Sequence, residues 1–481
     1  MRGYVNVAQT EGGFAVTPSQ SLRSMFYLQP QGAAREIPRS ITLQGGEALY
    51  FGSRMFQLPL ATPYARIPDA PTRQTSYCDE SMKLEAILKN RIVITAASIL
   101  GLIASFYIYV LDTSSRSLID LNVYTQAAQA LSAGENIYQK IYTVTDRWGR
   151  SIQLYYFYPP LLAHALSLFT SASEQTLKFG WCLCNYILML VTTVCLSKIS
   201  EPSWWGKIAT LPRTLIIGFF VFCFEPLYVG NGDGQVTALV LALLSMMTLA
   251  GMRRCYMLEG AVLAVAVQIK MSPVLLLLAP IVFQRWRTLT SFAASSLVLI
   301  VLTVVGGGGV QPFIDFASSL THTVDDALLK GHVFNFVINR TILEPLGLAH
   351  VALARWVVKI GFLALALLGT ICISRQSGFT YLRALGFLII CMIITSPIIW
   401  FHHFAWILLP IAIISMKPAS DNDKKMKNLT IALGLYFALS QTYLLNVWTH
   451  KLAPSFMWIS ALVPTLLLGL VAASSYRQRE P

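Results

Sequence analysis

The sequence predicts an all-α polytopic membrane protein with about twelve transmembrane helices. Three observations lead to this fold class. Hydrophobic residues make up 55% of the 481-residue chain and charged residues only 12%, about half the share that is usual in soluble domains. The apolar residues form long runs, several of them close to the ~20 residues that a helix needs to cross a bilayer. The 36 basic residues outnumber the 23 acidic ones and lie mainly between these runs, where membrane proteins carry cytoplasmic loop charges.

The first 81 residues differ from the rest of the chain. Residues 1–81 contain no sustained apolar run and no apolar core of the kind found in signal peptides. We expect an N-terminal extension of undefined fold there, and it is a candidate for disorder. The membrane domain is expected over residues 82–481, and its first basic residues are Lys83, Lys89 and Arg91.

Thirteen apolar runs follow one another along this domain. The first, Ile92–Leu111, has a basic amino-terminal flank, which predicts a cytoplasmic start. The other runs are expected at 156–171, 179–197, 208–229, 234–251, 256–269, 271–284, 289–309, 351–374, 384–400, 402–416, 428–447 and 456–475.

The charges between the runs indicate that one run does not cross the membrane. Five basic clusters mark the cytoplasmic side, and the last is the tail Arg477–Arg479. Thirteen crossings would put this tail outside, so we expect the short run 156–171 to be re-entrant. Runs 256–269 and 271–284 read as one broken pair hinged at Lys270, because Pro273 removes a backbone donor.

The outer loop 112–155 carries the first candidate for chemistry. Its apolar spacing predicts an amphipathic helix over Leu118–Leu131, ended by Gly134 and lying in the membrane interface. Asp120 stands at the start of this helix, one turn before Tyr124. Two readings remain open for Asp120: a capping box with Ser117, or a catalytic carboxylate.

Three further candidates come from polar residues beside apolar runs. Lys270 lies between two apolar half-spans, where a charge is costly and is as a rule functional or paired; it would bind a phosphate or extend to the interface. His402 and His403 open the run 402–416. Adjacent histidines on a helix point in different directions, so hydrogen bonding to phosphate or sugar and simple core packing remain the alternatives.

Other motifs are open between a structural and a binding role. Tyr158 belongs to an aromatic cluster that suits either an interfacial belt or the wall of a site for a sugar or a polyisoprenoid. Gln235 ends a Gly-rich segment that begins at Asn231. This segment is either a tight turn between two helices, with Asp233 and Gln235 in solvent, or a segment that contacts the substrate. The loop 310–350, which holds Arg340, is polar enough to cover a cavity mouth.

Several function classes find no support in the sequence. A Walker pattern, a GxGxxG motif, zinc-ligand spacing and a nucleophile triad are all missing. The net charge of +13 is spread between apolar runs, so nucleic-acid binding is not expected. The eight cysteines lie mostly in or beside apolar runs, where they serve as small packing residues.

Taken in order, these motifs resemble glycosyltransferase family 87, the polyprenol-phosphate-sugar-dependent transferases of the GT-C class. The resemblance covers about residues 90–475 and leaves out residues 1–81. It is carried by the order and spacing of these motifs: Asp120–Tyr124 with its Ala-rich helix, Gly134, Asn136–Tyr138, Tyr158–Pro160, Gly234–Gln235, Ile269–Pro273, Arg285–Arg287, Asn335 with Arg340, and Ser396–His403.

The resemblance implies a GT-C-like bundle of about twelve transmembrane helices, with interfacial helices in the first outer loop and an active site on the extracytoplasmic face. It implies that Asp120 is the base of an inverting transfer of a hexose, mannose in this family, from polyprenyl phosphate to a lipid or glycan acceptor. The residues expected to bind the donor phosphate or the substrate are Lys270, His402, His403, Arg340, Tyr124, Tyr158 and Gln235.

The chain departs from the family pattern in one respect: the second acid of the first loop, Asp112, is not adjacent to Asp120, so the loop has no acidic pair that would favour a bound metal. No metal and no cofactor are expected. The expected partners are the lipid-linked sugar donor, a glycolipid or glycan acceptor and membrane lipid, in a bacterial cytoplasmic membrane. The alternative function is a transporter or flippase of lipid-linked sugars, which would show the same broken helices and intramembrane charge. The sequence shows no internal duplication, and its polar residues favour one face, which argues for the transferase.

Overall fold

The structure is a computed structural model that describes most of the membrane domain. The chain divides after Arg73 into two units, and every described residue lies in the second unit, Gln74–Pro481. The described residues are 91–145, 149, 151–201, 210–329, 352–375, 380–395 and 401–414. The predicted extension 1–81 and the predicted runs 428–447 and 456–475 lie outside them.

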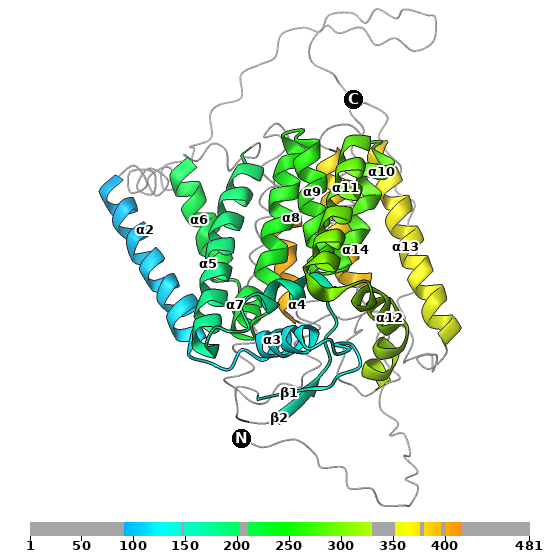
Figure 1. Ribbon diagram of the computed structural model, residues 1–481. Helices are drawn as coiled ribbons and strands as arrows, with labels where there is room; N and C mark the ends of the chain where they lie inside the picture. Colours follow the sequence, from blue (N-terminus) through cyan, green and yellow to red (C-terminus); the bar gives the residue numbers. More distant parts are fainter. Residues whose placement is uncertain are drawn as a thin grey trace, which may run out of the picture. The chain divides into compact units, whose positions relative to one another are not determined.

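Helices make up almost all of the described residues (Figure 1). The first is α2 (Arg91–Phe106), which continues as the π-helical turn η1 (Tyr107–Asp112). The other elements, in chain order, are α3 (Ile119–Ser132), β1 (Tyr142–Thr145), β2 (Ser151–Leu154), α4 (Pro160–Ser167), α5 (Glu174–Ile199), α6 (Thr210–Phe222), α7 (Glu225–Gly232), α8 (Thr237–Met252), α9 (Tyr256–Ile269), the 3-10 helix η3 (Ser272–Leu277), α10 (Leu278–Val282), α11 (Trp286–Thr303), the π-helical turn η4 (Val304–Gly308), α12 (Gln311–Leu329), α13 (Ala352–Ser374), α14 (Thr380–Thr395), the 3-10 helix η6 (Phe401–Ile407) and α15 (Leu408–Ile414).

Some of these helices are long and apolar enough to cross a membrane. Among the described residues there are three such stretches, Val93–Asp112, Glu174–Ile199 and Trp286–Gly306, and α6 with α7 would make a fourth. The helices α6 and α7 are bent by 56° at their junction, which corrects the single run predicted at 208–229. The backbone is extended at Phe224 and Pro226 lies in the first turn of α7, so the hydrogen-bond ladder of α6 is not continued.

Two interruptions that the sequence predicts are present in the structure. The helix α4, in the predicted run 156–171, has eight residues, and about 12 Å of helix is too short to cross a bilayer. The helix α9 ends at Ile269, the backbone of Lys270 is extended, and the chain continues as η3 with Pro273 in its first turn. A proline at this point cannot extend the preceding helix.

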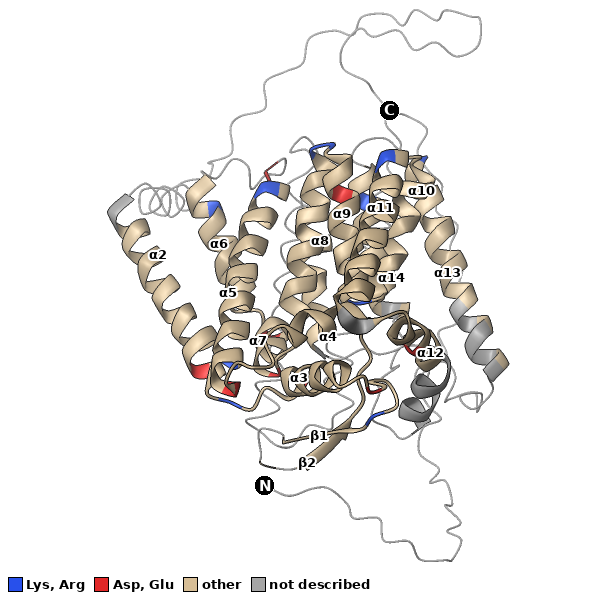
Figure 2. Cartoon of the chain, viewed as in Figure 1, with Lys and Arg blue, Asp and Glu red and all other residues tan. Residues whose placement is uncertain are grey.

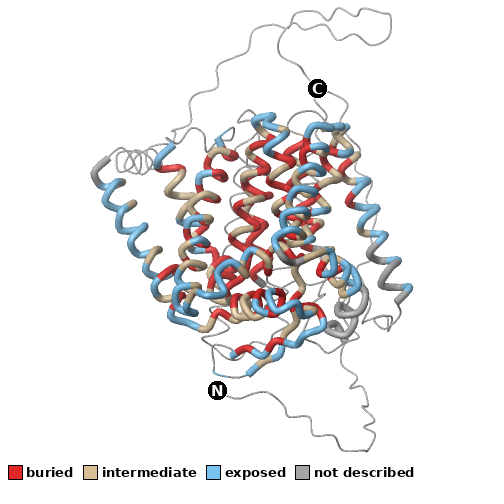
Figure 3. Tube along the Cα trace, viewed as in Figure 1, coloured by how far each residue is buried: buried red, intermediate tan, exposed pale blue. Residues whose placement is uncertain are grey.

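The core of the bundle lies around α8. This helix packs between α5 and α9, and most of its residues are buried (Figure 3). By contrast, α2 and α13 expose large apolar side chains, among them Leu100, Ile103 and Leu365. Long apolar helices with one exposed apolar face are suited to contact lipid.

The helices α9 and α11 approach each other closely at Gly260. A Cβ atom at Gly260 would lie 2.2 Å from the backbone oxygen of Thr288. Close by, the Ser291 hydroxyl donates to the Met257 carbonyl at 2.6 Å. Small residues allow membrane helices to approach in this way, so the contact between α9 and α11 depends on the glycine.

A buried ionic network lies at the same end of these helices. The Glu259 carboxylate is 1% exposed and lies 3.2 Å from the Arg285 guanidinium. It also accepts hydrogen bonds from the hydroxyls of Thr288, at 3.0 Å, and Tyr381. Each partner satisfies part of the buried charge of Glu259. Because these partners belong to different elements, the network joins α9, the start of α11 and α14.

The two ends of the bundle differ in character (Figure 2). The α8–α9 turn, with Arg253 and Arg254, and the start of α11 lie at one end, and α3, α4 and the hairpin β1–β2 lie at the other. The hairpin is an addition to the expected all-helical fold. Its strands are antiparallel, with Tyr142 opposite Leu154, and burial alternates along β1 as the period of a strand requires.

Candidate active site

The start of α3 rests on the Gly-rich turn between α7 and α8. Gly234 has a φ angle of +76°, and a Cβ atom there would lie 2.9 Å from the Leu121 Cβ and 3.0 Å from the Leu118 Cβ. Glycine alone adopts this left-handed backbone without strain and leaves room for α3. The backbone N–H of Asp120 donates to the carbonyl of Asp233 at 2.8 Å, which holds the helix start against the turn.

The side chain of a buried asparagine, Asn231, connects the same turn to two neighbouring elements by hydrogen bonds. The Asn231 side chain accepts a hydrogen bond from the Asn185 amide at 3.1 Å and donates to the Tyr109 carbonyl at 3.0 Å. The turn is therefore tied to α5 and η1. The sequence analysis did not single out Asn185, although a buried amide inside an apolar span is itself a signal, since it needs a partner.

Asp120 does not cap its helix. The N-cap of α3 is Leu118, and no side chain there makes a capping hydrogen bond. The Ser117 hydroxyl donates to the Thr145 carbonyl of β1 instead. The capping box is therefore not formed, and the half-buried Asp120 carboxylate hydrogen-bonds with the Gln235 side chain.

Gln235 lies at the centre of the site. Its Oε1 accepts hydrogen bonds from the hydroxyls of Tyr124, at 3.1 Å, and Tyr158, at 2.9 Å. The two rings pack edge to face with centroids 4.9 Å apart. Since both hydroxyls use the amide oxygen, the amide NH₂ is left to donate to the Asp120 carboxylate. Gln235 is 3% exposed, so the reading that placed it in solvent is wrong.

Lys270 reaches the same place from the break after α9. Its Nζ lies 2.5 Å from the His403 Nε2 and 5.3 Å from the ring centroids of both Tyr158 and Trp406. It also interacts electrostatically with Asp120. The carboxylate of Asp120 and the ammonium group of Lys270 therefore face one site. Tyr158 contacts both sides of it, because its ring lies near Lys270 and its hydroxyl donates to Gln235, the hydrogen-bond partner of Asp120.

The two histidines are buried side by side in η6. His402 is 4% exposed and His403 1% exposed, and their ring centroids are 4.4 Å apart at 79°. His403 stacks on Trp406 at 5.0 Å. The Nε2 atom of His402 has no hydrogen-bond partner among the residues that the structure describes. Sequence reasoning missed Trp406, which its position one turn after His403 would have indicated.

The environment of Asp120 changes its acidity. Burial raises the pKa of the carboxyl from 3.8 to about 7, and the nearby Asp233 carboxylate raises it further, while the Gln235 hydrogen bond and Lys270 oppose the shift. Loss of solvation disfavours the charged form. A carboxyl group that exchanges its proton near neutral pH is well matched to general-base chemistry.

Other residues that the sequence singled out lie elsewhere. Asp112 forms an ion pair with Arg116 at the surface. Arg340, Asn335 and the segment 396–400 lie outside the described residues. Within the described part of the chain, no three His, Cys, Asp or Glu side chains come together as a metal site would require.

Comparison with known proteins assigns the sequence to a family. Residues 156–399 match glycosyltransferase family 87, a range that includes Tyr158, Gln235 and Lys270 and leaves out Asp120. The chain is also 24% identical over 388 residues to the polyprenol-phosphate-mannose-dependent alpha-(1-2)-phosphatidylinositol mannoside mannosyltransferase of Mycolicibacterium smegmatis, which covers 74% of this chain and 84% of that relative. Because the family match spans just over half of the 481 residues, the chain belongs to glycosyltransferase family 87 and is a membrane glycosyltransferase.

Proposed function

We propose that this glycosyltransferase moves a hexose, mannose in the first instance, from a polyprenyl-phosphate donor to a lipid or glycan acceptor, with inversion at the anomeric carbon. The relative from Mycolicibacterium smegmatis is by its name dependent on polyprenol-phosphate-mannose, which supports this donor. The arrangement of one carboxylate opposite one ammonium group and an unpaired histidine nitrogen supports the reaction type.

Asp120 acts as the general base in this proposal. Its carboxylate takes the proton of the acceptor hydroxyl while the hydroxyl oxygen forms a bond to the anomeric carbon of the donor sugar. The bond between that carbon and the phosphate oxygen breaks on the opposite face, which inverts the configuration. Gln235 orients the carboxylate, and the hydroxyls of Tyr124 and Tyr158 hold Gln235 in place.

Lys270 and His402 stabilise the departing phosphate. Polyprenyl phosphate leaves with the electron pair of the broken bond, so negative charge develops on its oxygens. Lys270 has donors beyond the one directed at His403, and His402 Nε2 carries no internal hydrogen bond among the described residues. Donors placed in advance where charge develops are an effective form of catalysis. Arg340 stays a candidate for the same role.

The site is proposed to face the extracytoplasmic side of the cell membrane. The basic turn at Arg253 and the basic start of α11 lie at the end of the bundle away from α3 (Figure 2), and basic loops are enriched on the cytoplasmic side. The helix α3 would then lie in the outer interface, as in a GT-C bundle of about twelve membrane helices. A lipid-linked donor would enter this site laterally from the bilayer.

The observation that carries the proposal is the meeting of Asp120 and Lys270 at Gln235 and Tyr158. It is tested with purified protein in lipid nanodiscs, radiolabelled polyprenyl-phosphate mannose and a bacterial glycolipid extract. We expect label in a new glycolipid with wild type and at least a ~10³-fold loss with Asp120→Asn. The matched control is Asp112→Asn, which removes a carboxylate paired with Arg116 at the surface and should keep full activity.

Two results would overturn parts of this proposal. Transfer that survives Asp120→Asn at the wild-type rate would remove Asp120 as the base. Movement of intact donor across the bilayer, with no label in any glycolipid although donor binding is retained, would favour transport of the lipid-linked sugar instead. In either case the transfer rates of Lys270→Met and Lys270→Arg should be compared. Activity kept only by Lys270→Arg would mean that the positive charge at this position is what the site requires.

A further inference from the structure

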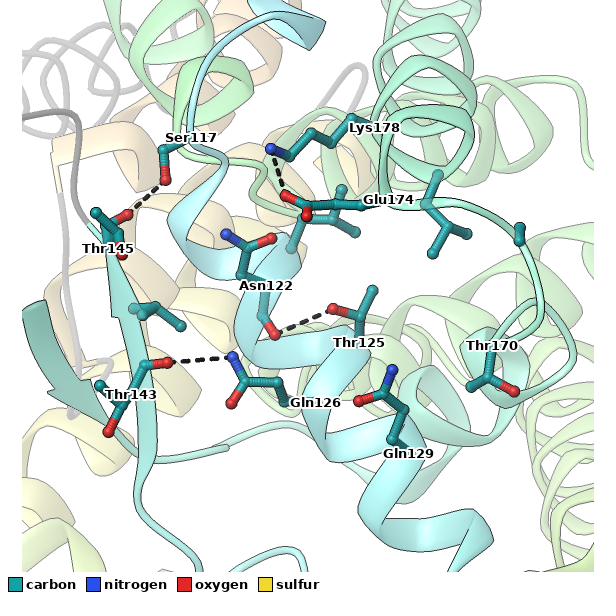
Figure 4. A pocket seen from close by; sticks show the side chains of 14 residues that line it. Ser117, Asn122, Thr125, Gln126, Gln129, Thr143, Thr145, Thr170, Glu174 and Lys178 are labelled. Carbon is teal, nitrogen blue, oxygen red and sulfur yellow. Dashed lines mark hydrogen bonds and ion pairs between the residues drawn. The ribbon is translucent and has the colours of Figure 1, made fainter. Parts of the chain in front are cut away.

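A polar pocket lies on the outer face of α3, away from Asp120 (Figure 4). Its volume is about 430 Å³, and it is bordered by α3, strand β1, and the segment from Thr170 to the first turn of α5. This volume is within the range of small-molecule sites, ~300–1,000 Å³. Asp120, Gln235 and Lys270 are not among the residues that line it.

The pocket and the proposed catalytic site use opposite faces of one helix. Successive residues of an α-helix are turned by about 100°. Asp120 and Tyr124 therefore point to one side of α3, toward Gln235. Asn122, Gln126 and Gln129 point to the other side, into the pocket. A ligand in the pocket would not touch the reacting groups.

The chemistry of the lining favours a neutral ligand rich in hydroxyl groups. Asn122, Gln126, Gln129 and hydroxyls from β1 supply amide and hydroxyl hydrogen-bond groups. The two charged residues in the lining, Lys178 and Glu174, pair with each other at 2.6 Å, so they leave no net charge to attract a phosphate or an ammonium group.

Several of these polar groups are open to a ligand. The Gln126 amide nitrogen donates to the Thr143 carbonyl at 3.2 Å, which fixes the side chain and leaves its oxygen free to accept a bond. The side-chain amides of Asn122 and Gln129 have no hydrogen-bond partner among the described residues. Leu121 and Val144 add buried apolar side chains to the lining, and amides combined with apolar side chains suit the polar and apolar surfaces of a sugar ring.

We propose that this pocket binds a neutral glycan, separately from the site at Asp120. The lining contains no aromatic side chain, so the sugar is held by hydrogen bonds without ring stacking, and the affinity is on the order of millimolar. The glycan is either the part of the acceptor remote from the reacting hydroxyl, a case that rests on the proposed function, or another neutral glycan near the membrane surface.

Binding is measured with mannotriose and the full chain in nanodiscs, by saturation-transfer NMR and titration calorimetry. We expect the double variant Asn122→Ala/Gln129→Ala to weaken binding at least about tenfold. Thr143→Phe, an exposed position on β1, should block the pocket without relying on lost hydrogen bonds. The control Gln139→Ala changes an exposed glutamine outside the pocket and should bind as wild type does.

The failure of this proposal is distinguishable from a failure of the proposed function. Asp120→Asn should retain mannotriose binding although it loses transfer, and inorganic phosphate should not compete for the pocket. A raised KM for the acceptor at constant kcat in the double variant would assign the pocket to the acceptor; lost binding with an unchanged KM would assign it to another glycan. Wild-type and double-variant proteins that bind mannotriose equally, or wild type that does not bind it, would overturn the proposal.

Discussion

At Asp120, the sequence left a capping role and a catalytic role open, and the hydrogen bonds of the structure exclude the capping role. A capping carboxylate would bond the orphan N–H groups of its own helix, whereas the structure gives α3 no side-chain cap. The backbone N–H of Asp120 is used by Asp233, and the carboxylate is turned to Gln235. The residue type and its place in the chain were readable from the sequence, but the partner on a turn more than a hundred residues later was not.

The raised pKa of Asp120 predicts how transfer depends on pH. A general base must be deprotonated, and its pKa is about 7, so kcat/KM should fall by about tenfold for each pH unit on the acid side of this value. The Gln235 hydrogen bond lowers this pKa, so Gln235→Leu should move the inflection to higher pH. Initial rates between pH 5.5 and 8.5 check both statements. A flat profile, or activity that rises toward low pH, would contradict the role of a base.

The same raised pKa of Asp120 predicts that the stability of the fold decreases as pH rises, whereas the activity increases. Because the pKa rises on folding, the folded state holds the proton more tightly than the unfolded state between about pH 4 and 7, so stability falls as pH rises through this window. Asp120→Asn removes that loss. The variant should unfold at a temperature at least about 2 °C above wild type at pH 8, corresponding to ~1 kcal/mol, and the difference should shrink at pH 5. Thermal unfolding in detergent measures it, with Asp112→Asn as the control that shows no such trend.

At the scale of elements, what the sequence predicted depended on how local the cause was. Pro273 interrupts its own segment, so the break at Lys270 was predictable, and the structure has it. The bend between α6 and α7 has a similar local cause at Pro226, although residues 208–229 were predicted as one run. The hairpin β1–β2 depends on packing of Tyr142 and Val144 beside α3, and four-residue strands give little periodic signal on their own.

The contact between α9 and α11 gives a prediction at this scale. A Cβ atom at Gly260 would meet the Thr288 backbone oxygen at 2.2 Å, so Gly260→Ala must push the helices apart and should destabilise the fold by about 1–3 kcal/mol. The matched control is Gly101→Ala in α2, where no atom lies within 4 Å of the added Cβ. The yield of monodisperse protein and its apparent melting temperature report the effect. Equal behaviour of the two variants would mean that the close approach at Gly260 does not limit stability.

At the scale of the molecule, the site depends on elements that meet only in the fold. Asp120 comes from α3, Gln235 from the turn before α8, Lys270 from the break after α9, and the histidines from η6. Composition and apolar runs predicted a helical membrane protein, and polar residues beside those runs marked each candidate separately. Their convergence was not readable from spacing, since it follows from how α3 is seated on the turn at Gly234 and how η6 packs against α7.

The proposed orientation predicts which end of the bundle a membrane-impermeant reagent can reach. Thr145 is exposed on β1, at the end that carries α3, whereas the native Cys255 is exposed beside the basic turn after α8. Two variants, each with a single cysteine, are compared in intact cells: one has Thr145→Cys, the other keeps Cys255, and all remaining cysteines are replaced by alanine. The first should react with an impermeant maleimide before lysis and the second only after the membrane is opened, because the basic turn is expected to face the cytoplasm. The reverse order of labelling would place α3 and Asp120 on the cytoplasmic side, and the donor would then have to be supplied from that leaflet.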